Sequence, residues 1–271
     1  MSALIMIASA ATIILLVKFG LLRGIDNIAN AMKWDAKLRG QLTGYATSVP
    51  ELVCLVSAGL AGVWTAGLWN IASSNIINAA LMMFAASFHG QFSELFNKRF
   101  IDEVTFAALA VFVPIVLMRW DMDMQWYLVP LLLLFFAIYQ VVDRRVNRSQ
   151  SDSKSMEAVG NLPLGLILGL SALIAIAIAG TFLGNATAEV VEQMGVRPAI
   201  AGWILGVVTS IPEMVSFFAV YAASRREGRQ HELHDTQEAL DNLTGSNMAN
   251  VGFVYPIGLL VFLLASLFLA G

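Results

Sequence analysis

Two short stretches of the sequence, ATSVPE at residues 46–51 and NIASSNIIN at residues 70–78, decide the fold because each returns once in the second half of the chain. The first returns as VTSIPE at residues 208–213, and the second returns as NLTGSNMAN at residues 242–250. Two matched motifs in the same order indicate an internal repeat.

Glycines upstream of the first motif strengthen the match. Gly40 and Gly44 correspond to Gly202 and Gly206 at an offset of 162 residues, the offset of the first motif pair. The second motif pair is offset by 172 residues, so the second half carries a ten-residue insertion. The repeat motifs therefore cover residues 40–78 and 202–250.

The composition places these repeats in a membrane. Of the 271 residues, 58% are hydrophobic and 13% are charged, about half the roughly 25% charged share of a soluble domain. Stretches without Asp, Glu, Lys or Arg recur at residues 52–93, 104–118, 158–188 and 242–271. Since a crossing needs about 20 mostly apolar residues, we expect an all-α, polytopic transmembrane helical bundle. The single cysteine, Cys54, excludes an internal disulfide.

Hydropathy predicts about eight spans. They lie near residues 2–22, 41–60, 67–89, 103–119, 125–142, 160–182, 198–222 and 242–268. With the N-terminus outside, 13 of the 16 Lys and Arg residues fall in internal segments, and only Lys18, Arg119 and Arg197 do not. The positive-inside rule therefore predicts that both termini are outside, in a multi-pass protein of the plasma (inner) membrane.

The polar run at residues 144–157 is predicted to be a cytoplasmic linker between two transmembrane halves, residues 1–143 and 158–271. Spans one to three correspond to spans six to eight. Five spans separate the members of each pair, so the copies cross the membrane in opposite directions. Inverted repeats with interrupted helices are the architecture of secondary transporters, whose substrate site lies near the bilayer midplane.

The two glutamates of the first motif are the strongest candidates for that site. Glu51 and Glu213 lie within apolar spans, where an ionised carboxylate is costly enough to suggest a function. Each follows a proline, Pro50 or Pro212. Because proline cannot donate a backbone hydrogen bond, a carbonyl one turn earlier loses its helical partner and could bind a cation.

Neutral oxygens surround each glutamate in the sequence. The hydroxyls are those of Thr47, Ser48, Thr209 and Ser210, and polar residues at a spacing of four follow at Asn70, Ser74 and Asn78 and again at Asn242, Ser246 and Asn250. Calcium takes six to eight oxygen ligands, and zinc or copper would favour His and Cys. Two glutamates neutralise one divalent ion. After that ion leaves, sodium ions or protons must take its place, which predicts exchange.

Other interpretations of these motifs stay open. A proline can simply kink a transmembrane helix, and Asn or Ser often bonds a neighbouring helix. A non-transporting cation-binding or channel-like membrane module would also fit. Since no Ser/His or Asp pair is placed at membrane depth as nucleophile and base, we expect no enzyme.

The paired motifs resemble those of the calcium/cation antiporter superfamily, which includes the sodium/calcium exchangers. Its signatures run roughly GTSxPE and GNxxGSNxxN, repeated with inversion. The resemblance implies that Glu51 and Glu213 coordinate calcium. It also implies that the neighbouring ligands are Thr47, Ser48, Thr209, Ser210, Ser74, Asn78, Ser246 and Asn250. It further implies cations and the lipid bilayer as partners, with no cofactor and no nucleic acid.

The sequence departs from the family pattern in three places. Ala46 and Val208 replace the leading glycine of GTSxPE, and Asn250 stands where some sodium/calcium exchangers have Asp. The sequence ends after the eighth of the usual ten spans, so we expect either a short member or a truncated one. A second copy of the chain could cover the face left by the missing spans.

Overall fold

The computed structural model describes residues 1–32, 46–146, 160–226 and 233–269. Every element in these ranges is helical. Six helical stretches are long and apolar enough to cross a membrane: Ser2–Ala31, Trp64–Phe88, Lys98–Arg119, Leu162–Gln193, Pro198–Ala222 and Thr236–Phe268. Two shorter apolar helices are Val49–Leu60 and Leu128–Asp143. The predicted all-α bundle of about eight spans is confirmed. Most of the predicted linker, together with Gly40 and Gly44, lies outside the described residues.

The α-helices are α1 (Ser2–Leu16), α2 (Leu22–Ala31), α4 (Val49–Leu60), α5 (Trp64–Phe88), α6 (Ile101–Arg119), α7 (Leu128–Val146), α8 (Leu162–Ala188), α9 (Pro198–Thr209), α10 (Ile211–Arg226), α11 (His234–Ala249) and α12 (Tyr255–Leu269). Three π-helical segments join them: η1 (Val17–Leu21), η5 (Glu189–Gln193) and η6 (Asn250–Val254). Two 3₁₀ turns, η2 (Phe92–Phe96) and η3 (Lys98–Phe100), precede α6.

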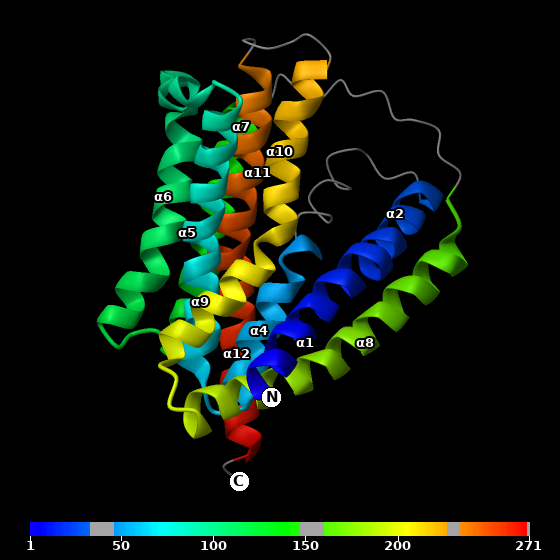
Figure 1. Cartoon of the computed structure of the whole chain (residues 1–271), viewed down its shortest axis with the longest axis vertical. Coiled ribbons are helices and arrows are strands. Elements are labelled where there is room, and N and C mark those ends of the chain that lie inside the picture. Colours follow the sequence, from blue (N-terminus) through cyan, green and yellow to red (C-terminus); the bar gives the residue numbers. More distant parts are fainter. Residues whose placement is uncertain (33–45, 147–159, 227–232, 270–271) are drawn as a thin grey trace.

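The helices form two groups (Figure 1). Helices α1, α2 and α8 make a tilted pair of long rods, and α5, α6, α7, α10 and α11 stand upright beside them. The N-terminal end of α1 and the C-terminal end of α12 both point to the lower part of the view.

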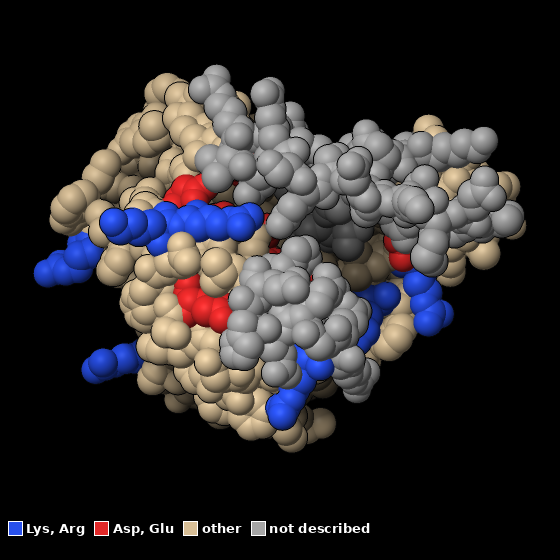
Figure 2. All heavy atoms as spheres, turned by 90° about the horizontal axis from the view of Figure 1, so that it is seen from above, with Lys and Arg blue, Asp and Glu red and all other residues tan. Residues whose placement is uncertain are grey.

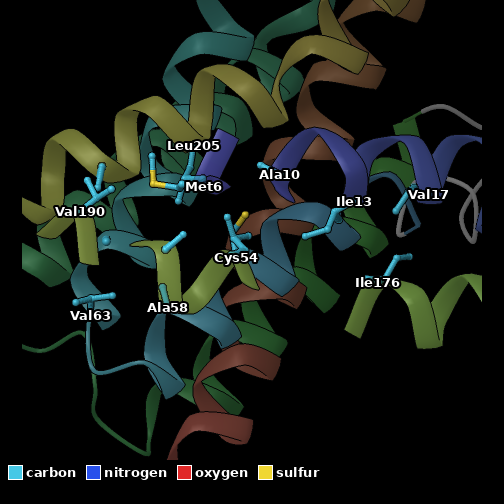
Figure 3. Close-up of a cluster of buried hydrophobic side chains, with 14 of the residues drawn as sticks. Met6, Ala10, Ile13, Val17, Cys54, Ala58, Val63, Ile176, Val190 and Leu205 are labelled. Atoms are coloured by element: carbon cyan, nitrogen blue, oxygen red, sulfur yellow. The ribbon is translucent and has the colours of Figure 1, made fainter. Parts of the chain in front are cut away.

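One hydrophobic cluster joins the tilted pair to the upright bundle (Figure 3). Met6 and Ile13 of α1 are fully buried in it, together with Cys54 of α4 and Leu205 of α9. Since the cluster includes Cys54 of α4 and Leu205 of α9, it holds the tilted helices against one helix from each repeat. Cys54 serves here as a small packing residue.

The last span begins earlier than hydropathy predicts, with α11 starting at His234 and not near residue 242. Its first turns are polar, but Thr236 and Gln237 are buried and donate hydrogen bonds to Glu94 and Glu103. Buried polar groups with such partners are stable inside a bundle. A hydropathy average does not register this pairing.

Helices α5 and α9 pack so closely that Gly202 of α9 leaves no room for a side chain. A Cβ added there would lie 2.6 Å from the Ala66 carbonyl oxygen and 2.9 Å from the Asn70 backbone nitrogen. We therefore expect Gly202→Ala to destabilise the protein by about 1–3 kcal/mol, the usual cost of overpacking. Thermal unfolding in detergent would measure this. Gly169→Ala is the control, because its Cβ would meet nothing within 4 Å; equal midpoints for the two variants would contradict the prediction.

Candidate cation site

Both copies of the first motif interrupt a helix at the same place. Ser48 separates a helical turn at Ala46 and Thr47 from α4, and Ser210 separates α9 from α10. The backbone angles agree closely, with φ −88° and ψ 3° at Ser48 and φ −83° and ψ −1° at Ser210. The predicted interruptions are therefore present. They fall two residues before each proline, and the ligand role of the carbonyls of Ala46 and Val208 stays a prediction.

The two breaks bring the glutamates into the interior. Glu51 and Glu213 lie in the first turns of α4 and α10 and are 1% and 5% exposed. They are close enough to interact electrostatically with each other. Thr209 of the second repeat lies within reach of Glu51 of the first, and Ser246 donates to Glu213 Oε1 at 3.4 Å. Each carboxylate thus meets a hydroxyl.

The second motifs lie on α5 and at the junction of α11 with η6, and amide groups join these elements. Asn250 Nδ2 donates to Ser74 Oγ at 3.2 Å and to Asn75 Oδ1 at 2.9 Å. Asn78 Nδ2 donates to Asn247 Oδ1 at 3.2 Å, and Asn247 Nδ2 donates to the Asn75 carbonyl at 3.0 Å. Hydrogen bonds of asparagine side chains therefore connect the two repeats directly.

Hydroxyls of the second repeat extend the network to α5. Thr209 Oγ1 donates to Asn70 Oδ1 at 3.3 Å, and Ser210 Oγ donates to the Ser74 carbonyl at 3.5 Å. Ser48 is 1% exposed, and Thr47 is half-buried. Nine of the ten predicted ligands are thus buried; they are Ser48, Glu51, Ser74, Asn78, Thr209, Ser210, Glu213, Ser246 and Asn250.

Sequence reasoning missed two members of this network, Asn75 and Asn247. Both are fully buried, and each bonds to the other repeat. They correspond to each other at the offset of 172 residues, inside motifs that were already recognised. The repeat could have identified both residues. The spacing of four, however, selects the helix face of Asn70, Ser74 and Asn78, which does not include Asn75.

Several oxygens in this network lack a hydrogen-bond donor within the described part of the chain. They are buried and belong to Ser48 Oγ, Glu51 Oε2, Asn78 Oδ1, Glu213 Oε2 and Asn250 Oδ1. A buried polar atom without a partner costs about 1–3 kcal/mol, and more when the group is charged. These five atoms come from both repeats, and oxygen is the atom that a hard cation binds.

Imidazole and thiolate ligands do not gather here. Among the described residues, no group of three or more His, Cys, Asp or Glu side chains is placed to hold a metal ion. A cation bound between Glu51 and Glu213 would therefore take most of its ligands from hydroxyl, amide and backbone oxygens. Such a ligand set favours weakly held, exchangeable hard cations over zinc or copper.

The halves are not equivalent in detail. Asn70 accepts a hydrogen bond from Thr209, whereas its counterpart Asn242 donates to Ser216 Oγ at 2.6 Å. A π-helical segment begins at Asn250, whereas its counterpart Asn78 lies within the continuous α5 helix. The two repeats therefore hold the same residues in two different local environments.

Comparison with known proteins gives a family. The sequence model of the family described as "Sodium/calcium exchanger protein" matches residues 2–143 and 164–269. Searches of curated proteins and of solved structures returned no match. The family match includes both copies of both motifs and covers most of the chain. The chain therefore belongs to the sodium/calcium exchanger family, whose members are multi-pass membrane transporters of cations.

Proposed function

We propose that the chain exchanges Ca²⁺ for Na⁺ or H⁺ at a site between Glu51 and Glu213. The observation that carries this proposal is the set of buried oxygens without donors on both repeats. A dehydrated cation would give each of them a partner. Thr47, Thr209, Ser210 and Ser246 supply further ligands, since they adjoin the glutamates in sequence or space. Ser74 supplies another and is joined to Ser210 by a hydrogen bond.

Charge supports calcium as the transported ion. Two carboxylates in a low-dielectric interior repel each other unless positive charge lies between them. One Ca²⁺ neutralises both, and so do two sodium ions or two protons. Because these ions compete for the same oxygens, the site is loaded with one kind at a time, which couples the two fluxes.

The unequal halves support alternating access. In an inverted repeat, the two copies exchange conformations when the site changes the side of the membrane to which it opens. In a state that is open to one side of the membrane, they must therefore differ. Two differences of this kind are the different partners of Asn70 and Asn242 and the π-helical segment that begins at Asn250 but not at Asn78.

Calcium flux with separately imposed gradients tests the proposal. We expect ⁴⁵Ca²⁺ uptake into proteoliposomes to be saturable and to accelerate at least tenfold when an outward sodium gradient or an outward proton gradient is imposed. The gradient that drives uptake identifies the counter-ion. Liposomes without protein are the control. Ohmic calcium conductance that neither gradient drives would contradict exchange and favour the channel-like alternative.

A further inference from the structure

A second group of acidic side chains lies where α6 and α11 begin, away from Glu51 and Glu213. Gln237 of α11 joins two carboxylates there. Its Nε2 donates to Glu103 Oε1 at 2.7 Å and to Asp241 Oδ1 at 3.0 Å. Both hydrogens of one amide are thus used to hold two negatively charged groups together.

Further negative charge surrounds this pair. Among the described residues, the charged side chains that act on Asp241 are the acids Asp143 of α7, Asp102 of α6 and Glu238 of α11. Asp102 also acts on Glu103. Figure 2, seen from the end where α6 and α11 begin, shows acidic patches with Lys and Arg side chains around them. The described charges that act directly on Asp241 are therefore negative.

Glu103 is unusual for a glutamate in the first turn of a helix, because its side chain is buried and only 4% exposed. Thr244 fixes its backbone by donating to the Glu103 carbonyl at 3.1 Å, and Gln237 fixes one carboxylate oxygen. The other oxygen, Oε2, is buried and has no hydrogen-bond partner among the described residues. A buried carboxylate oxygen without a hydrogen-bond donor points to a missing positive ligand.

We propose that Glu103 and Asp241 bind a divalent cation at this end of the bundle, at a site separate from the exchange site. In the structure, Gln237 Nε2 lies against both carboxylates and donates to each, so the amide must turn before a cation can approach them. Rotation of the amide by half a turn would replace this donor with the Gln237 carbonyl oxygen, a third ligand. Water would complete the six to eight oxygens that calcium takes.

The place of this site suggests its role as a loading position. Asp241 precedes Ser246, which contacts Glu213, by five residues of helix, or about 7.5 Å of rise. The positive-inside rule assigns this end, which carries Lys98 and Arg99, to the cytoplasm. A cation held by Glu103 and Asp241 would therefore lie at the predicted cytoplasmic entrance to the exchange site.

Calcium binding to the purified full chain in lipid nanodiscs separates the two sites. We expect Glu51→Gln/Glu213→Gln to retain one class of ⁴⁵Ca²⁺ site. Adding Glu103→Gln or Asp241→Asn should weaken that residual binding at least tenfold. Gln237→Glu in the same background should strengthen it about tenfold, because calcium affinity rises with the number of charged ligands.

Glu238→Gln is the matched control, since it removes one exposed acid from the same helix and leaves the bridged pair intact. It should change the residual affinity by less than about threefold, as expected for a screened surface charge. Residual binding that is insensitive to Glu103, Asp241 and Gln237 would overturn the second site. The second site would also be overturned if the double variant Glu51→Gln/Glu213→Gln bound no calcium at all. Unaltered total binding in that double variant would instead contradict the proposed exchange site.

Discussion

Glu51→Gln and Glu213→Gln are each expected to reduce gradient-driven calcium flux at least a hundredfold, to the level of liposomes without protein. Either change leaves one carboxylate to face a divalent ion in a buried site. The uncompensated positive charge is costly at low dielectric, so the ion does not leave water for the site. Initial rates of ⁴⁵Ca²⁺ uptake under the driving gradient would measure the loss.

Glu192→Gln provides the control, because Glu192 is exposed at the end of the η5 segment and should alter flux less than twofold. Stability separates a lost site from a lost fold. Without bound cations, glutamine removes a buried charge, so the variants should unfold at the same temperature as the parent or above it. If either folded variant kept the full calcium flux, the proposed role of the two glutamates as cation ligands would be wrong.

The sequence was sufficient to predict the helical class, and it identified Glu51 and Glu213 as the main candidates because the first motif occurs twice in the chain. Chance similarity could explain one Pro-Glu pair in an apolar helix, but not two in register. The structure buries Glu51 and Glu213 close to each other, as an inverted repeat requires. Their role as cation ligands stays a prediction that the flux experiment tests.

Contacts between helices could not be read from the sequence. The positions of Asn75 and Asn247 in the sequence do not predict that each forms a hydrogen bond with the other repeat. The early start of α11 was missed for a related reason, because Gln237 is tolerated in the bundle only through its bonds to Glu103 and Asp241. Hydropathy evaluates residues one by one, whereas the cost of burying a polar group depends on its partner.

Asn250→Asp is expected to make the protein's stability depend on calcium. Asn250 Nδ2 donates two hydrogen bonds, and one of its acceptors, Asn75 Oδ1, lies 2.9 Å away. In the Asn250→Asp variant, a carboxylate oxygen would replace this Nδ2 donor and would face Asn75 Oδ1, so two acceptors would repel each other. Asn75 cannot simply rotate, because its own Nδ2 donates to the Ala110 carbonyl at 2.9 Å. We expect a loss of about 3 kcal/mol without cations, measured by thermal unfolding in chelator.

Calcium should reverse this loss, because the variant offers three carboxylates where the parent offers two. A ligand that binds only the folded state stabilises it in proportion to the logarithm of its concentration over its Kd, so the calcium-induced rise in the unfolding midpoint should be larger in Asn250→Asp than in the parent. Asn242→Asp is the control. Asn242 is half-buried and bonds to a serine hydroxyl, which can donate to a carboxylate equally well. That variant should unfold like the parent in chelator. If calcium stabilised Asn250→Asp no more than the parent, Asn250 would not face the cation, and the network it forms with Ser74 and Asn75 would serve packing alone.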